Sequence, residues 1–209
     1  MFRRSRFVLC AAVLALPFLV SATPGSANSS MDETEIQGRS TDPIAPPTRL
    51  SDIDPSSGSF ASFPGATTSS ASKQAEFIDA FLTGQSDVIT AGDCRYRQAI
   101  DLPHRSGGDT SIHGWWLRAG GTCPAESNVD TYLQSYWCDR WGCRWITVDS
   151  DSRDVRPGGG RGRRGNARQT CATTNSAGWR GFVDVDLIGQ SDPSGYTYSD
   201  PRNLSCTPS

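Results

Sequence analysis

The sequence predicts an all-β domain: an antiparallel β-sandwich of about seven short strands, of immunoglobulin-like size, with three disulfides. Two observations lead to this class. Short segments carry apolar residues at every second position between Gly, Pro, Asp or Ser, and the same stretch holds an even set of cysteines. The expected strands are 94–100, 111–118, 130–138, 143–149, 166–172, 179–188 and 203–206. A small β-barrel built from the same strands is the alternative.

The segment 179–188, WRGFVDVDLI, shows this alternation most clearly. Successive side chains of a strand point to opposite faces, so every second residue shares one environment. The expected core face holds Trp179, Val183, Val185 and Leu187. The expected outer face holds Arg180, Asp184 and Asp186. Because the Asp-x-Asp pair of this outer face lies within a strand, it does not match a calcium-binding loop.

The first 27 residues have the organisation of a secretory signal peptide. Three arginines precede the fourteen mostly apolar residues 7–20, and small residues then offer cleavage sites after Ala22 or Ala27. A helix of fourteen residues is too short to cross a hydrocarbon core of about 30 Å. The sequence therefore predicts a secreted, extracellular protein whose mature chain does not span a membrane.

Two segments separate the signal peptide 1–27 from the β domain, which is expected at 94–209. Residues 28–72 are acidic, rich in Ser and Pro and poor in aliphatic side chains, which predicts a disordered segment. Residues 73–93 are expected to form a short helix or linker. Within them, apolar side chains recur at helical spacing in 73–83 before Gly84.

The cysteines predict a disulfide framework. After removal of the signal peptide the chain keeps Cys94, Cys123, Cys138, Cys143, Cys171 and Cys206. An even number in an exported chain favours three disulfides, although the sequence alone permits many pairings. The short connection favours Cys138–Cys143, and Cys94–Cys123 and Cys171–Cys206 then follow by proximity. A zinc site is the alternative, but no Cys-x2-Cys spacing supports it, and no metal is expected.

Composition and charge exclude several classes of protein. The formal net charge of the chain is −2, and residues 94–209 hold fourteen arginines against twelve acids. The sequence shows no collagen repeat and no heptad repeat, and it has no long apolar segment after the N-terminus. A β domain with so small a positive charge does not favour a nucleic-acid partner.

Three tryptophans are candidates for a binding site: Trp115, Trp116 and Trp141. Adjacent residues of a strand point to opposite faces, so Trp115 and Trp116 cannot both lie in the core. Trp141 lies in the expected turn 139–142, where it has no core to fill. Exposed aromatic side chains on rigid β elements suit sugar rings or protein partners because they offer contact area at low entropic cost.

A second candidate site is the stretch 156–168, RPGGGRGRRGNAR, which holds five arginines and no acid. Guanidinium groups bind carboxylate, sulfate and phosphate through paired hydrogen bonds, and a glycine-rich backbone lets an anion approach. Arg161, Arg163 and Arg164 are therefore candidate anion-binding residues. The three aspartates within 149–154 lie just upstream, where they could instead neutralise this charge.

The remaining candidates for chemistry are His104, His113 and Glu126. These are the only two histidines and the only glutamate after Glu76. Two imidazoles, or one imidazole with a carboxylate and arginines, suffice for general acid–base cleavage of RNA. A small secreted hydrolase or ribonuclease is therefore the alternative function, and it requires these side chains to converge in space.

A further alternative is a protease inhibitor that presents Arg140 on the Cys138–Cys143 hairpin, because a hairpin closed by a disulfide is preorganised. The first expectation from the residues, however, is a secreted, non-enzymatic binding domain without a cofactor. Its ligand would be an extracellular or envelope glycan, an anionic polymer or a protein.

Several segments of residues 94–209 also point to a group of proteins. These segments are PHRSGG, HGWW, the pair Cys138 and Cys143 with Trp145, and GWRGFVDVDLIG. Together they resemble the small secreted Cys- and Trp-rich proteins of high-GC Gram-positive bacteria, which have no assigned function. The resemblance implies neither an activity nor catalytic residues.

Overall fold

The computed structural model describes residues 48–68 and 84–209. Within these ranges the chain forms β-strands joined by turns, with two short 3₁₀ helices, Leu50–Asp52 (η1) and Pro55–Ser57 (η2). The expected signal peptide and the expected helix at 73–83 lie outside the described residues. No helix in the described part of the chain is long and apolar enough to cross a membrane.

The strands confirm the all-β class. In chain order they are β1 (Gly58–Phe60), β2 (Thr67–Thr68), β3 (Ile89–Ala91), β4 (Cys94–Ile100), β5 (His104–Ser106), β6 (Asp109–Gly120), β7 (Ser127–Asp139), β8 (Gly142–Val155), β9 (Gly165–Leu187), β10 (Thr197–Tyr198) and β11 (Arg202–Pro208). Neighbouring strands run antiparallel, apart from β2 beside β11.

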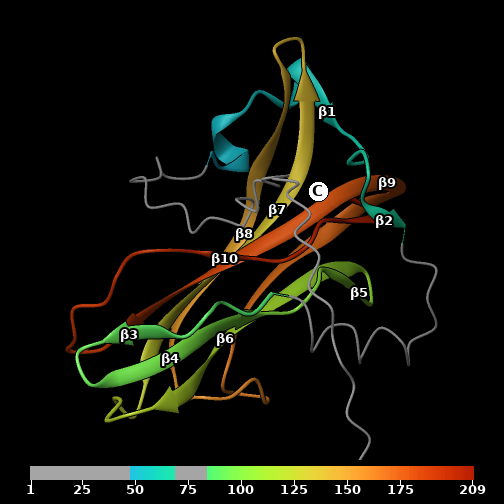
Figure 1. Ribbon diagram of the computed structural model, residues 1–209. Helices are drawn as coiled ribbons and strands as arrows, with labels where there is room; N and C mark the ends of the chain where they lie inside the picture. The colour runs from blue at the N-terminus through green and yellow to red at the C-terminus, as the bar shows by residue number, and fades with distance from the viewer. Residues whose placement is uncertain (1–47, 69–83) are drawn as a thin grey trace, which may run out of the picture. The chain divides into compact units, whose positions relative to one another are not determined.

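Strand β9 joins the two halves of the sheet. The central path of the sheet runs β1–β7–β9–β6–β4–β3, and β8 pairs with β7. Residues 165–170 of β9 pair with β6, whereas residues 179–187 pair with β7. The expected strands 166–172 and 179–188 are therefore parts of one strand of 23 residues. The resulting sheet is curled into a half-barrel, so the expected sandwich is not confirmed (Figure 1).

Two aspartates of β8 link this strand to β9. The carboxylate of Asp151 accepts a hydrogen bond of 2.7 Å from the backbone N–H of Asn166. The carboxylate of Asp149 accepts one of 2.6 Å from the backbone N–H of Arg168. Within the described residues no second strand pairs with residues 165–170 of β9 on this edge, so the two carboxylates supply acceptors to its backbone N–H groups.

Strand structure also begins upstream of the domain start expected at Cys94. Strand β3 pairs with β4, and β1 pairs with the end of β7, with Gly58 opposite Asp139. A Cβ atom at Gly58 would lie only 2.3 Å from the carbonyl oxygen of Cys138, so the close approach of β1 to β7 requires glycine there. Residues 58–68 therefore contribute to the sheet, although the sequence places them in the acidic segment.

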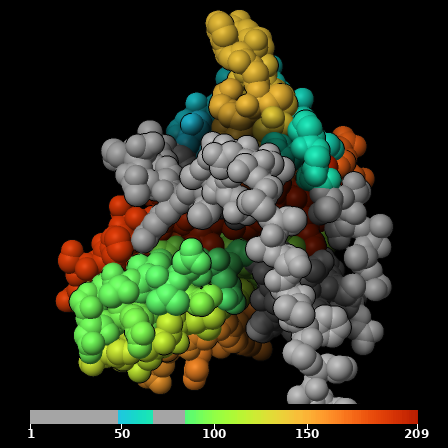
Figure 2. All heavy atoms as spheres, viewed as in Figure 1, coloured from blue at the N-terminus to red at the C-terminus, as the bar shows by residue number. Residues whose placement is uncertain are grey.

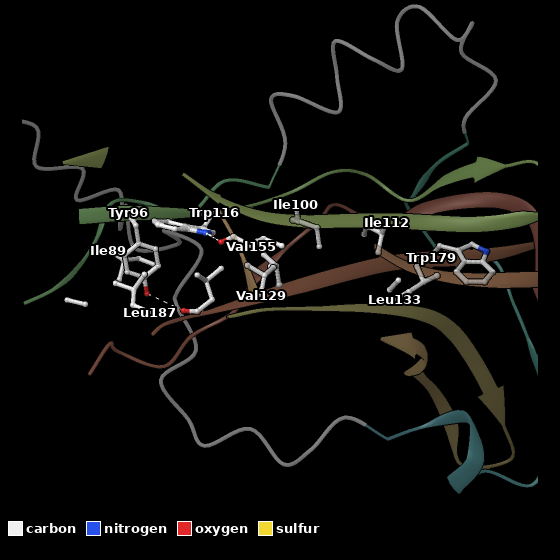
Figure 3. Packing of buried hydrophobic residues seen from close by; sticks show 14 of the residues in the cluster. Ile89, Tyr96, Ile100, Ile112, Trp116, Val129, Leu133, Val155, Trp179 and Leu187 are labelled. Atoms are coloured by element: carbon white, nitrogen blue, oxygen red, sulfur yellow. Dashed lines mark hydrogen bonds between the residues drawn. The ribbon is translucent and has the colours of Figure 1, made fainter. Parts of the chain in front are cut away.

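The core lies between the two halves of the curled sheet (Figure 3). Trp116 and Trp179 are the largest of its fully buried side chains. The Nε1–H of Trp116 donates to the carbonyl oxygen of Val155 at 2.9 Å, and that of Trp179 donates to the carbonyl oxygen of Cys206 at 3.0 Å. Both indoles therefore bury a large apolar surface without leaving a donor unpaired.

The alternation expected for 179–188 is confirmed. Trp179, Val183, Val185 and Leu187 are buried. On the opposite face, Arg180 and Asp184 are half-buried and Asp186 is exposed. One face of this part of β9 therefore packs in the core while its charged side chains point outward.

The expected disulfides are also confirmed. They are Cys94–Cys123, Cys138–Cys143 and Cys171–Cys206. The first joins the start of β4 to the connection between β6 and β7, the second crosses the β7–β8 hairpin, and the third joins β9 to β11. Three disulfides fit an extracellular protein, because thiols stay reduced in the cytosol.

The half-buried face of β9 makes the stability of the fold depend on pH. Burial raises the pKa of Asp184 from its usual 3.8 to about 7, and the negative charge of Asp186 adds to this shift. Between these two values the folded chain holds a proton that the unfolded chain has lost. The free energy of unfolding therefore falls as the pH rises from about 4 to about 7.

Asp184→Asn is expected to stabilise the fold by about 1–2 kcal/mol at pH 8, a figure already reduced for the partial exposure of the carboxyl group. At pH 4 the variant and the wild type should have similar stability, because Asp184 is then protonated. Urea unfolding at both pH values measures the difference, with the exposed Asp87→Asn as the matched control. Equal stability of variant and wild type at pH 8 would contradict the raised pKa.

Candidate functional site

The candidate site residues lie in three places: the tip of the β7–β8 hairpin, the loop 156–164, and a histidine cluster at the connection of β4, β5 and β6. The tip carries Trp141. The loop carries Arg161, Arg163 and Arg164.

Trp141 lies at the tip of the longest hairpin of the sheet. Asp139 of β7 stands opposite Gly142 of β8, which leaves a two-residue turn formed by Arg140 and Trp141. The side chain of Trp141 is 80% exposed, the highest value among the large apolar residues that the structure describes. Figure 2 shows this tip, in gold, projecting beyond the neighbouring strands.

Several contacts hold the tip in one conformation. The carboxylate of Asp139 accepts hydrogen bonds from Arg144 at 2.7 Å and from the backbone N–H of Trp141 at 2.8 Å. These two donors lower the pKa of Asp139, so the carboxylate stays ionised at neutral pH. The disulfide Cys138–Cys143 lies one residue pair below the turn. The tip is therefore preorganised and would lose little conformational entropy on contact with a ligand.

Arg140 gives the exposed indole a charged neighbour. Its guanidinium carbon lies 4.8 Å from the centroid of the Trp141 ring, a cation–π contact. One face of the indole is thus covered by the cation, and the other face is open to a ligand.

The two adjacent tryptophans of β6 lie on opposite faces, as the alternation of a strand requires. Trp116 lies in the core and offers no surface to a ligand in this conformation. Trp115 is buried beneath the loop 156–164, where a Cβ atom at Gly159 would lie 2.9 Å from its indole. The flat ring therefore supports the arginine-rich loop, and only a glycine allows the backbone to pass so close.

Three of the four arginines in the loop 156–164 have no acidic partner in the described part of the chain, whereas Arg156 pairs with Glu126. Arg161 and Arg163 are exposed, and none of Arg161, Arg163 and Arg164 forms an ion pair within the residues that the structure describes. The acids that could have neutralised them have other partners, because Asp149 and Asp151 bind the backbone of β9. The loop therefore presents uncompensated positive charge.

The two histidines converge. His113 lies in β6, and His104 begins β5, which pairs with β6. Their rings are stacked, with centroids 5.3 Å apart and planes inclined by 28°. The antiparallel ladder explains this proximity: residues 104 and 111 stand opposite each other, and residues 111 and 113 share a face.

Asp101 completes the cluster. Its carboxylate accepts two hydrogen bonds of 2.6 Å from His113, one from the backbone N–H and one from Nδ1. The Nδ1 atom of His104 lies 3.9 Å from the same carboxylate and 3.0 Å from the carbonyl oxygen of Leu102. Potential ligand atoms of Asp101, His104 and His113 all lie within 4.8 Å of one another. This arrangement can bind a metal ion, or it can act as a carboxylate–histidine base.

Glu126 lies outside this cluster. It precedes β7 and pairs with Arg156, with 3.3 Å between the Nε of Arg156 and the carboxylate. The carboxylate beside the histidines is instead that of Asp101, which the sequence does not single out. A signal was present in the spacing Asp101-Leu-Pro-His104, but its meaning depends on the hairpin of β5 and β6, and β5 was not among the expected strands.

The hairpin tip and the arginine-rich loop lie at opposite ends of β8, whose 14 residues span about 45 Å at about 3.3 Å per residue. They are therefore separate surfaces, and any function has to be inferred from the geometry of each. Comparisons of the chain with protein-family models, with curated proteins and with solved structures give no match.

Proposed function

We propose that this protein is a secreted, non-enzymatic domain that binds an acidic extracellular or envelope glycan through the tip of the β7–β8 hairpin. The observation that carries the proposal is the 80% exposure of Trp141 on a turn held by a disulfide and by Asp139. Exposing so large an apolar ring has no benefit for folding, whereas a rigid exposed ring is suited to binding.

The chemistry of the tip favours a ligand that is both cyclic and anionic. The open face of Trp141 suits the apolar face of a sugar ring, and Arg140 suits a carboxylate, sulfate or phosphate beside it. Arg161, Arg163 and Arg164 provide a second cationic contact at the other end of β8. An extended polymer can reach both surfaces, and two linked contacts increase the overall affinity.

The inhibitor hypothesis is less well supported by the turn. A peptide segment that binds to a partner protein as an added β-strand has an extended backbone. Arg140 is instead the first residue of a two-residue turn, so its backbone is not presented to a protease in an extended form. A protein partner, such as a trypsin-like protease, is the alternative ligand class.

Trp141→Ala is expected to weaken binding by about 5- to 150-fold, the range for an aromatic residue that contributes 1–3 kcal/mol. The probes are polygalacturonate and poly(glycerol phosphate), with neutral dextran as the reference polymer, and calorimetry gives the affinity. Tyr198→Ala is the matched control, because Tyr198 is an exposed aromatic residue (41%) away from the tip. Its affinity should equal that of the wild type.

Two results would contradict the proposal. One is equal affinity for dextran and for the acidic polymers, which would leave Arg140 without a role. The other is the absence of binding to any polymer together with stoichiometric inhibition of trypsin-like proteases, which would favour the inhibitor hypothesis instead.

A further inference from the structure

The histidine cluster has the donor atoms of a metal site. It offers two imidazoles and one carboxylate, and it is the only group of at least three possible ligands that lies so close together within 48–68 and 84–209. We propose that the imidazoles of His104 and His113 bind a divalent late-transition-metal ion, with Zn²⁺ and Cu²⁺ as the best-matched ions and with Asp101 as the residue that orients His113. This inference is independent of the glycan contact at the hairpin tip.

The hydrogen bonds of the two histidine rings use the Nδ1 atoms and leave the Nε2 atoms available to bind a metal ion. A carbonyl oxygen only accepts hydrogen bonds, so the Nδ1 of His104 carries a proton that it donates to Leu102. The Nδ1 of His113 donates in the same way to the carboxylate of Asp101. Each Nε2 then keeps its lone pair. Histidines that bind metals are generally oriented by such a bond to a carboxylate or a backbone carbonyl.

The charge of the cluster also calls for a cation. The side chain of Asp101 is only 12% exposed, and its only neighbours at ion-pair distance within the described residues are the two histidines, whose rings carry no charge while each Nε2 keeps its lone pair. Arg168, on the same face of the sheet, pairs with Asp109 instead. An enclosed carboxylate needs a compensating positive charge, which a metal ion on the adjacent imidazoles supplies.

An ion can reach the cluster from solvent. The side chain of His104 is 27% exposed and that of His113 is 11% exposed, so the pair lies at the surface with one ring above the other. Water would complete the coordination of the ion on this open side.

The donor set selects the class of metal. Imidazole nitrogen suits Zn²⁺, Cu²⁺ and Ni²⁺, whereas Ca²⁺ and Mg²⁺ prefer sites made of oxygen alone. The chain has only two histidines, and both lie in this cluster. Any spectroscopic signal of imidazole coordination must therefore come from this site.

The test uses the full chain without a polyhistidine tag, with its disulfides intact and with metal removed by EDTA. Calorimetry with Zn²⁺ should show one ion per chain. Two-dimensional ¹H–¹⁵N NMR should show both rings with the proton on Nδ1, and a shift of both Nε2 resonances when Zn²⁺ is added. Cu²⁺ should give an electron paramagnetic resonance spectrum with nitrogen couplings.

Variants then assign the ligands. His104→Ala and His113→Ala should each weaken Zn²⁺ binding at least 100-fold, and Asp101→Asn should weaken it about 10- to 100-fold through the orientation of His113. Asp87→Asn, an exposed acid outside the cluster, should bind Zn²⁺ as the wild type does. Trp141→Ala should also bind normally, so the proposal for the hairpin tip can fail without affecting this one.

Three results would overturn the inference. The first is the absence of saturable binding of Zn²⁺ or Cu²⁺ to the wild type. The second is binding that leaves both imidazole spectra unchanged. The third is hydrolysis of RNA in EDTA that both histidine variants lose, which would make the cluster an acid–base site. The NMR and Cu²⁺ spectra need only the wild type, so they decide the question even if His113→Ala does not fold.

Discussion

Trp116→Ala is expected to lower the free energy of unfolding by about 3–5 kcal/mol. The indole of Trp116 is fully buried, and its Nε1–H donates to the carbonyl oxygen of Val155 at 2.9 Å. Alanine would leave a cavity between the two halves of the sheet and an unpaired carbonyl oxygen at the end of β8. Urea unfolding followed by circular dichroism, with the disulfides oxidised, measures the loss.

Trp141→Ala provides the matched control, since it removes the same side chain from the exposed hairpin tip. Its effect on stability should stay within about 0.5 kcal/mol. If Trp116→Ala is too unstable to purify, Trp116→Phe can replace it. Phenylalanine retains most of the apolar volume, so the loss of stability should lie between those of Trp116→Ala and Trp141→Ala. Similar stabilities for Trp116→Ala and Trp141→Ala would mean that Trp116 is not part of the core.

Removal of the disulfide Cys171–Cys206 by paired serine substitution is expected to destabilise the fold by about 4 kcal/mol. The bond closes the longest of the three disulfide loops, with a sequence separation of 35 residues, and so restricts the unfolded chain most. The same substitution at Cys138 and Cys143, which are five residues apart, should cost about 2 kcal/mol. Chemical denaturation of the two double variants shows which disulfide contributes more to the free energy of unfolding.

A larger loss of stability on removal of Cys138–Cys143 than of Cys171–Cys206 would contradict this expectation. The Cys138–Cys143 disulfide supports a tip that projects from the sheet, whereas Cys171–Cys206 joins β9 to β11 beside the core. A larger loss at the hairpin would show that the tip contributes more to global stability than its exposure indicates. Loop entropy would then not be the main source of stabilisation.

Much of the fold follows from patterns that are local in the sequence. The alternation in WRGFVDVDLI placed Trp179 and Asp184 on opposite faces of a strand, because side-chain direction in a strand depends only on position. The expected strand 94–100 agrees with β4 at both ends. Proximity along the chain also favoured the three disulfides, because short loops are easiest to close.

The short strands could not be predicted from local sequence patterns. Strands β1, β2, β3, β5 and β10 have two or three residues each, too few for a period-two pattern. They form because a longer strand offers unpaired backbone groups to them, as β7 does to β1. That partner is about 80 residues away in the chain, and only the three-dimensional arrangement reveals it.

The candidate site was predicted only in part, because contacts between distant segments cannot be read from local sequence patterns. The sequence singled out His104 and His113 from their chemistry, and the β5–β6 ladder brings them together. It grouped them with Glu126 because the glutamate was rare, whereas spatial proximity depends on strand register. That register places Asp101 beside His113 and leaves Glu126 with Arg156.

The shared strand β9 has a consequence for the order of events during synthesis. Both β6 and β7 leave the ribosome before residues 165–187, yet each of them needs β9 as a neighbour in the sheet. Neither half can close its share of the core until residues 165–187, close to the end of the chain, have emerged. Contacts between residues this far apart slow folding, so the chain stays open for longer while it is being made. A late central strand would thus keep the chain open until its synthesis is nearly complete, which is the state that passage through a secretion channel would need if the chain is exported as its N-terminus predicts.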